Sequence, residues 1–570
     1  MKRPRQRVVP EAGAAAGLVV LVLLAYLPAL GAGFIWDDDD HVTENPTLRT
    51  ADGLRRIWLE VGAVPQYYPM VHTTFWIEYR MWGLNPLGYH LTNILLHAAS
   101  AILLWRLLKR LEVPGAWLAA AVFGCHPVHV ESVAWVTERK NVLSAAFYLG
   151  AAHAWLSFRP LEGGPSQGRE SWRGYPAVVA LFLGALLSKT VTATFPAAML
   201  VLAWWRTGRV AARQIAPAAP LLALGAGMGI LTAWMERSVV GASGGAWDLS
   251  LVERVLVAGR AAWFYLAKLL WPHPLVFIYP RWPIDPHAAA QYAFPLGAAA
   301  VLFFFWSMRG RIGRAPLAGS LFFAGTLFPA LGFLNVYPMR YSFVADHFQY
   351  LASLGVLVPL VAWAANSLAR RGSWPLLAPA LGAVALAVLG AATLRQSSAY
   401  SDPEALWRDT LAKNPDAFSA HNNLGALLLA RGSTPEAREH FEEAARIAPE
   451  APEAYDNLGI VLHRDGRYDD AIASYLRALA IDPAFADAHN NLAITLAAIG
   501  KMDEAVSHFE QAIRHRPAFA RARYNLGLAL LRLGRVPEAY AQLSEAVRYD
   551  PLDPDMRRGL EEAAARRALP

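Results

Sequence analysis

A proline recurs every 34 residues near the carboxyl end of the chain, at Pro415, Pro449, Pro483, Pro517 and Pro551. A fixed period of this length is the signature of stacked structural repeats, in which each unit packs on its neighbours. An asparagine, a glycine and an alanine keep the same period. These are Asn423, Asn457, Asn491 and Asn525; Gly432, Gly466, Gly500 and Gly534; and Ala437, Ala471, Ala505 and Ala539. The spacing predicts a helical solenoid.

The pattern is identified as that of tetratricopeptide repeats, each of which is a helix–turn–helix. The small residues let the two helices pack closely, the glycine ends the first helix, and the proline starts the next unit. We expect four repeats over residues 417–552, preceded by a connecting helix over 396–416. Residues 553–570 are expected to form a polar capping helix.

Long apolar runs lie almost entirely before residue 395, although hydrophobic residues make up 55% of the whole chain. A membrane-spanning helix needs about 20 mostly apolar residues. Candidate spans lie near residues 12–33, 88–108, 115–129, 141–158, 175–188, 190–205, 217–235, 292–308, 315–333, 349–368 and 374–394. We therefore predict an all-α fold: a polytopic membrane domain of about eleven spans over residues 1–395, followed by the α-solenoid.

The net charge of +7 indicates membrane topology and not nucleic-acid binding, because the arginines cluster in short loops between apolar runs. With the basic head at residues 1–5 in the cytoplasm, the basic loops near residues 106–110, 206–213 and 309–314 all face the cytoplasm. The stretch 253–271, which carries three basic residues, is then expected to be an interfacial or re-entrant helix on the outer side. Eleven spans place the repeats outside the cytoplasm of an inner-membrane protein. A nucleic-acid partner is not expected.

The first apolar run has a second interpretation, because Ala29, Gly31 and Ala32 are small enough for signal-peptide cleavage. We favour a retained anchor, since further spans follow and an acidic cluster comes directly after it. The single cysteine, Cys125, allows no intrachain disulfide, so the compartment must be argued from topology.

Ionisable residues gather in the loops that should face outward. Such groups are costly at membrane depth, so they usually pair with one another or line a functional cavity. An acidic run by itself would more often be a solvated loop. Here other ionisable residues are expected on the same outer side, which favours a shared outer cavity. The candidates are Asp37 and Asp38 in the cluster Asp37–Asp40; His126, His129, Glu131, Glu138, Arg139 and Lys140; Lys189; and Arg340, Asp346 and His347.

His126, His129 and Glu131 lie beside Cys125 and raise the question of a metal site. The spacing His-x-x-His-x-Glu across a proline is not a standard zinc pattern, and no fourth ligand is evident. We favour structural hydrogen bonding or substrate contact. No cofactor is assigned, and a divalent metal is left open.

Five motifs in this order, followed by the repeats, carry a family resemblance. The sequence resembles the transmembrane and tetratricopeptide repeat-containing O-mannosyltransferases and their bacterial relatives, in the GT-C superfamily of glycosyltransferases. The chain departs from the family's pattern at four places, which puts the identity of the sugar in doubt. These are Glu138-Arg139-Lys140-Asn141 after the His/Glu motif, Lys189-Thr190, His347, and Tyr67-Tyr68-Pro69. The motifs lie at residues 34–38, 68–69 with 83–93, 126–134, 188–189 and 345–353.

The resemblance implies a polyprenyl-phosphate sugar as donor and an acceptor hydroxyl outside the cytoplasm. Such a hydroxyl needs a carboxylate to accept its proton. The family's base maps onto Asp37 or Asp38; we favour Asp37 as base, with Asp38 orienting it or the acceptor. The leaving phosphate needs cations, for which Lys189 is favoured over Arg139, Lys140 and Arg340. Binding of lipid headgroups is an equal alternative for Arg139 and Lys140.

The cavity set also includes His126, His129, Glu131, Asp346 and His347. Glu131 would orient a sugar hydroxyl or a histidine, with capping of a re-entrant helix as the alternative. In the repeats, Asn423, Asn457, Asn491 and Asn525 resemble the asparagine ladder of the nucleocytoplasmic O-GlcNAc transferase and are expected to bind acceptor peptide. Consensus packing is the alternative.

The leading hypothesis is an inverting glycosyltransferase of the membrane that moves a sugar to Ser or Thr of extracytoplasmic proteins presented by the repeats. One rival keeps the enzyme but takes a lipid-linked glycan or an envelope polysaccharide as acceptor. A second rival is a non-catalytic membrane scaffold. A transporter is less favoured, because the apolar segments show no internal pseudo-repeat.

Overall fold

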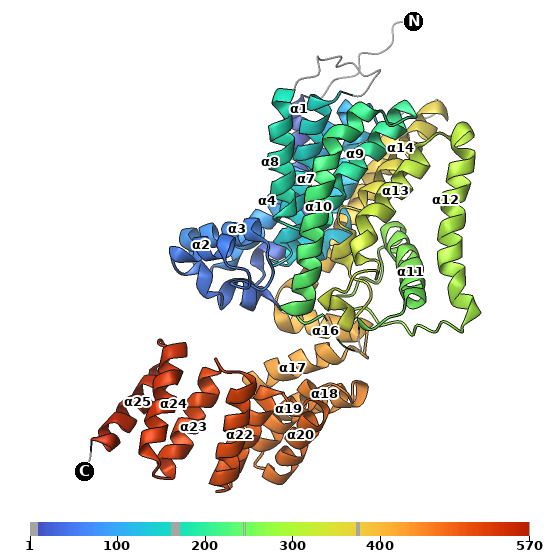
Figure 1. The fold of residues 1–570 in the computed structure, drawn as a ribbon. Helices are drawn as coiled ribbons and strands as arrows, with labels where there is room; N and C mark the ends of the chain where they lie inside the picture. Colours follow the sequence, from blue (N-terminus) through green and yellow to red (C-terminus); the bar gives the residue numbers. More distant parts are fainter. Residues whose placement is uncertain (1–9, 161–171, 243, 245–246, 372–376, 569–570) are drawn as a thin grey trace, which may run out of the picture. The chain divides into compact units, whose positions relative to one another are not determined.

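The protein is described by a computed structural model over residues 10–160, 172–242, 244, 247–371 and 377–568. Throughout these ranges the regular structure is helical and no strand occurs, which confirms the predicted all-α class (Figure 1). The chain divides into two compact units, Met1–Asp409 and Thr410–Pro570. The basic head at residues 1–5 lies outside the described residues.

A helix lies at each segment that was predicted to cross the membrane. Helices α4, α10 and α15, and α12 with the short turn before it, are long and apolar enough to do so, and five shorter helical segments are also apolar. The count of about eleven spans stays a prediction. The helices are α1 (Glu11–Ala25), α4 (Pro86–Arg110), α5 (Ala116–Cys125), α7 (Arg139–Phe158), α8 (Tyr175–Leu186), α9 (Phe195–Thr207), α10 (Ala212–Ser238), α12 (Ala293–Ile312), α13 (Ala315–Leu327), α14 (Leu354–Arg371) and α15 (Leu377–Ser397).

Two of these helices are shorter than the apolar runs suggested. Helix α1 ends at Ala25 and is followed by a short 3-10 turn that contains Pro28. Helix α5 ends at Cys125, because the residue before a proline is pushed out of the helical region and His126, before Pro127, has the extended angles φ −76° and ψ 123°. The chain therefore leaves both helices early and enters the loops that carry the candidate site.

Four further helices lie in the first unit, and a fifth, α16, begins there and ends in the second. They are α2 (Asp52–Leu59), α3 (Pro69–Trp82), α6 (Val130–Ala134), α11 (Leu251–Leu270) and α16 (Pro403–Lys413). Ser250 and Glu253 form a capping box at the start of α11, the stretch predicted to be interfacial. Its placement at the membrane surface stays a prediction. Within the unit, α1 packs on α4, α5 and α15, and α7 packs on α4 and α8.

The repeats form four pairs of helices over residues 418–549. The pairs are α17 (Phe418–Ala430) with α18 (Thr434–Ile447), α19 (Pro452–Arg464) with α20 (Tyr468–Ile481), α21 (Ala486–Ala498) with α22 (Met502–His515), and α23 (Ala520–Arg532) with α24 (Val536–Tyr549). Each periodic glycine lies after the first helix of its pair with φ between 73° and 86°, a left-handed conformation that favours glycine. Within the second repeat, Gly459 on α19 allows close packing against α20, since a Cβ there would lie 2.5 Å from the ring of Tyr475. Helix α25 (Pro554–Arg567) follows, capped by the Asp553 side chain.

A polar contact joins the two helices within three of the repeats. His421 Nδ1 lies 2.9 Å from His440 Nδ1, and its Nε2 lies 3.0 Å from the Pro415 carbonyl oxygen. The third repeat has the same arrangement, and the fourth replaces it with Arg523, which donates to Gln542 at 3.0 Å. We call the first of these contacts the histidine clasp.

Candidate active site

The acidic loop after α1 is anchored by Asp38 and not by Asp37. The carboxylate of Asp38 accepts hydrogen bonds from the Ile35 N–H at 2.9 Å, the Thr137 N–H at 2.8 Å and the Thr137 hydroxyl at 2.6 Å. Asp38 is fully buried. It therefore ties the acidic loop to the segment between α6 and α7, and its carboxylate does not line the cavity described below.

Trp36, directly before Asp37, has φ 49°, in the left-handed region that bulky residues rarely adopt. Such a conformation costs about 1–2 kcal/mol and persists only where the surroundings hold it. The Trp36 ring contacts the rings of Phe277, Tyr341 and Trp407 at centroid distances of 5.7, 6.0 and 4.8 Å. These contacts hold the backbone that directs Asp37.

The two neighbouring aspartates have different electrostatic surroundings. Burial raises the pKa of Asp37 to about 6, and the positive charge of Lys140 opposes that rise. Burial raises the pKa of Asp38 to about 7, although the hydrogen bonds from Ile35 and Thr137 favour its ionised form. Asp37 is therefore mostly ionised near neutral pH, as a proton acceptor must be.

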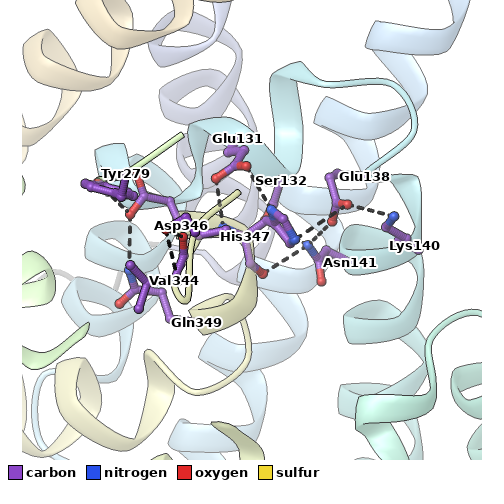
Figure 2. A network of polar contacts seen from close by, with 12 residues as sticks. Glu131, Ser132, Glu138, Lys140, Asn141, Tyr279, Val344, Asp346, His347 and Gln349 are labelled. Atoms are coloured by element: carbon purple, nitrogen blue, oxygen red, sulfur yellow. Dashed lines mark hydrogen bonds and ion pairs between the residues drawn. The ribbon is translucent and has the colours of Figure 1, made fainter. Parts of the chain in front are cut away.

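Glu138 is the centre of a buried polar network at the start of α7 (Figure 2). Its carboxylate lies 2.9 Å from Lys140 Nζ and 3.3 Å from Lys189 Nζ, and it accepts a hydrogen bond from the Asn141 amide. Burial would raise the pKa of Glu138, but His347, Lys140 and Lys189 outweigh burial and hold the pKa well below its usual value. The carboxylate therefore stays charged between two ammonium groups.

His347 links this network to Glu131 (Figure 2). Its ring Nδ1 lies 2.8 Å from one Glu131 carboxylate oxygen, and its backbone N–H donates to the other at 3.0 Å. Its Nε2 lies 3.9 Å from Glu138. The sequence alternatives for Glu131 included orienting a histidine, and the geometry places it against His347.

A cavity of about 380 Å³ joins these loops. The acidic loop forms one part of its wall, the segment around α6 and α7 a second part, and residues 337–347 before α14 a third. Its ionisable lining residues are Asp37, Asp40, His41, Glu131, Glu138, Lys140 and His347. Its aromatic lining residues are Trp36, Trp135, Phe277, Tyr337 and Tyr341. One space therefore presents carboxylates, an ammonium group and two imidazoles beside aromatic rings.

Lys189 is not in the cavity lining, but it contacts Glu138, which is. It donates to Asn141 Oδ1 at 2.8 Å and pairs with Glu138, and its side chain is 13% exposed. Burial lowers the pKa of Lys189 to about 8, and Glu138 opposes that change. Of the predicted cations, Lys140 is the one in the lining, whereas Arg340 lies outside it beside the ring of Tyr341.

Arg139 does not face the cavity. Its guanidinium is fully buried, pairs with Glu78 at 2.9 Å, and donates to the Thr74 hydroxyl and the Tyr89 carbonyl oxygen as well as to Asn93. Four of its five N–H groups are used inside the protein, and the side chain is fully buried outside the cavity lining, so it does not reach a phosphate bound in the cavity. We therefore withdraw Arg139 from the phosphate-binding set.

The two histidines of the His-x-x-His motif also lie outside the cavity lining. His126 Nε2 contacts the Leu269 carbonyl oxygen at 3.0 Å, and His129 contacts the Phe123 carbonyl oxygen and the Ser353 hydroxyl at 2.9 and 3.1 Å. Both are buried, which favours the structural alternative over a cavity role. Asp346 is likewise buried and accepts a hydrogen bond from Tyr279 at 3.0 Å (Figure 2).

The repeat asparagines bond mainly to the preceding repeat. Asn457 donates to Asn422, Asn491 to Asp456, and Asn525 to Asn490, each at 3.0 Å. Asn423 has no repeat before it and donates to the backbone of its own helix. These contacts between repeats therefore use amide N–H groups that were expected to bind acceptor peptide. Burial raises the pKa of Asp456, the one carboxylate among these acceptors, to about 7.

Two histidines that were missed from the sequence lie at the site. His41 lines the cavity, and the fully buried His72 on α3 stacks on it with a centroid distance of 5.2 Å. His41 directly follows the acidic cluster, which was the signal available. Across the part of the chain that the structure describes, no three His, Cys, Asp or Glu side chains converge to hold a metal ion.

Comparisons with known proteins agree with the repeat pattern. Tetratricopeptide repeat models match residues 416–484, 450–518 and 490–556. The solved structures that are similar include MamA, with 25% identity over 26% of this chain and 86% of that protein, at a TM-score of 0.24. The TPR protein YrrB has 21% identity over 34% of this chain and 97% of that protein, also at 0.24.

The curated homologues are O-mannosyltransferases of the type expected. The protein O-mannosyl-transferase F38B6.6 of Caenorhabditis elegans is 32% identical over 148 residues, covering 24% of this chain and 21% of that protein. The tmtc2 protein of Xenopus laevis is 34% identical over 140 residues, covering 23% and 17%. The matched stretch thus spans about a fifth of the length of these relatives.

Proposed function

We propose that this protein is an integral-membrane inverting glycosyltransferase of the GT-C type. It would move a sugar from a polyprenyl-phosphate donor to a Ser or Thr hydroxyl of proteins outside the cytoplasm. The observation that carries the proposal is the cavity in which Asp37, from the acidic loop, shares the lining with Lys140 at the start of α7 and with His347 before α14. The names of the relatives, protein O-mannosyl-transferases, support mannose as the sugar and protein as the acceptor.

In the proposed reaction, the acceptor oxygen attacks the anomeric carbon while the bond from that carbon to the phosphate oxygen breaks. The electron pair of that bond stays with the phosphate, and Asp37 accepts the hydroxyl proton. A single displacement of this kind inverts the anomeric configuration. Asp37 suits the role because it lines the cavity and its pKa of about 6 leaves it ionised at neutral pH.

The leaving phosphate gains charge during the reaction and needs cations close to it. Lys140 is the proposed primary contact, because it lines the cavity and Glu138 holds its ammonium group in place at 2.9 Å. Lys189 supports it from behind, paired with the same carboxylate. His347, held by Glu131 through Nδ1, is the proposed hydrogen-bond partner of a sugar hydroxyl through Nε2.

The repeats are proposed to bind the acceptor protein in the compartment that the cavity faces. An amide has two N–H donors and one acceptor oxygen, so a rung that uses one N–H leaves hydrogen-bonding capacity for a peptide backbone. We propose that the protein lies in the inner membrane, with its amino terminus in the cytoplasm and its repeats outside the cytoplasm, as the predicted topology requires.

The test is reconstitution in liposomes with labelled polyprenyl-phosphate sugars and envelope proteins. Asp37→Asn should abolish transfer, whereas Asp39→Asn should leave it within twofold of wild type, because Asp39 is exposed and outside the cavity lining. Label in glycolipid instead of protein would favour the lipid-linked acceptor. An absence of transfer from every donor, with partner capture by the repeats retained, would favour the scaffold and contradict the proposal.

A further inference from the structure

The segment after the last predicted span packs on the loop that carries Asp37. The Gly33 N–H donates to the Ser401 carbonyl oxygen at 2.9 Å. Farther along, Trp407 on α16 lies against Trp36 with a ring centroid distance of 4.8 Å and an interplanar angle of 56°. Residues from opposite ends of the first unit therefore form one wall beside the acidic loop.

Trp407 differs from the other two rings that hold Trp36. Phe277 and Tyr341 line the cavity, so a substrate can touch them directly. Trp407 is outside the lining and is 3% exposed, and its ring contacts two residues of the lining, Trp36 at 4.8 Å and Phe277 at 5.7 Å. Because Trp407 does not line the cavity itself, its effect on the reaction is expected to be indirect, through neighbours such as these.

The left-handed backbone of Trp36 is the reason that loss of the Trp407 contact should affect Asp37. A tryptophan at φ 49° returns toward negative φ unless its surroundings oppose that rotation. A change of φ at one residue redirects the next side chain, which here is Asp37. A catalytic group misplaced by about 1 Å can lose on the order of 100-fold in rate.

We propose that Trp407 is a positioning residue for Asp37: by packing on Trp36 it holds the backbone that aims the carboxylate into the cavity. This inference rests on the proposed function, which makes Asp37 the base. Helix α16 continues to Lys413, past the end of the first unit at Asp409. The contact that positions Asp37 is therefore made by the helix through which the chain enters the repeats.

The first test is kinetic and uses the full-length protein in liposomes. Trp407→Ala is expected to lower kcat by about 10- to 100-fold with the KM for a short acceptor peptide changed less than threefold. Trp407→Phe, which keeps a ring against Trp36, is expected to recover kcat to within threefold of wild type. Trp363→Ala, at a 69% exposed position on α14, is the matched control and should leave kcat unchanged. A kcat for Trp407→Ala within twofold of wild type overturns the proposal, as does a loss that Trp407→Phe fails to restore.

The second test does not need enzymatic activity. Asp37→Cys introduces a thiol into a chain whose single native cysteine, Cys125, is buried at 1% exposure. A water-soluble maleimide should label the introduced thiol at a rate that changes at least fivefold when Trp407→Ala is added, and less than twofold when Trp407→Phe is added.

Equal labelling rates in all three backgrounds overturn the positioning role, whatever the kinetics show. If wild type transfers no sugar from any donor, the proposed function fails, and the labelling rates alone decide whether Trp407 positions the side chain that follows Trp36.

Discussion

Among the hydrogen bonds that join the asparagines of one described repeat to the repeat before it, Asp456 is the acidic acceptor, and replacing it with asparagine should stabilise the repeat unit. The matching positions in the other rungs are Asn422 and Asn490, which accept the same hydrogen bond. Asp456 is buried, and burial raises its pKa from 3.8 to about 7, with Asp487 and Glu453 adding to the rise. The folded protein therefore favours the protonated form.

The size of the effect follows from linkage. A difference between about 7 in the folded state and 3.8 in the unfolded state corresponds to about 4 kcal/mol in the free energy of unfolding, since each pKa unit is worth about 1.4 kcal/mol. Because the folded pKa is raised, the folded state binds more protons between these values. Stability should thus fall as pH rises from about 4 to about 7. Asp456→Asn removes that loss, so its gain should approach 4 kcal/mol at pH 8 and vanish near pH 4.

The assay is urea unfolding of a fragment that begins at Thr410, the start of the second unit, followed by circular dichroism at pH 4.5, 6 and 8. The fragment has its own apolar core, which includes Tyr475 and Phe509. Asp487→Asn is a control, because it removes a nearby, partly exposed charge; since that charge pairs with Arg516, the change should give no comparable gain at pH 8. A gain that is the same at pH 4.5 and pH 8, or no gain at pH 8, would refute the reasoning.

Three further predictions address the site and the repeats. The rate of transfer should fall tenfold per pH unit below about pH 6, because Asp37 must be ionised to accept a proton, and a profile flat to pH 5 would contradict its role. Burial lowers the pKa of His421, so the histidine clasp should lose stability as pH falls below about 6.5. In the fragment, the double change His421→Arg and His440→Gln, which copies the fourth repeat, should reduce the loss of stability at acid pH in urea unfolding, with the His489–His508 contact of the third repeat still contributing to what remains. A loss equal to that of the unchanged fragment would contradict this role of the clasp. Arg139→Met leaves Glu78 as an unpaired buried charge and should cost about 3–5 kcal/mol, seen as a lower Tm of the detergent-solubilised protein; an unchanged Tm would show that the pair does not hold these loops.

Much of the fold could be predicted from the sequence because its signals are local. The 34-residue period predicted four helix pairs, and Gly432 and its three counterparts do adopt the left-handed conformation that ends the first helix of each pair. The apolar runs predicted where helices lie in the first unit. Their ends were predicted less well, as at His126, where a proline two residues after the helix outweighs the apolar run.

The candidate site was predicted only in part. The sequence indicated that Asp37, Glu131, Lys140 and His347 belong together, and the cavity brings them together. It could not indicate that Arg139, one residue before Lys140, points away from the cavity to Glu78. On a helix with about 3.6 residues per turn, successive side chains point in widely different directions, so neighbours in a motif can have unrelated partners.

By itself, the sequence determined the helical class, the repeat period and the segments that contribute polar groups, because helix propensity, apolar length and glycine conformation act over a few neighbouring residues. Only the tertiary structure decided which charged side chains face the cavity and which form ion pairs inside the protein. It also decided that Trp407 reaches Trp36 and that the repeat asparagines bond to the preceding repeat. Those outcomes depend on the distance and direction between atoms of distant segments, and no local pattern encodes them.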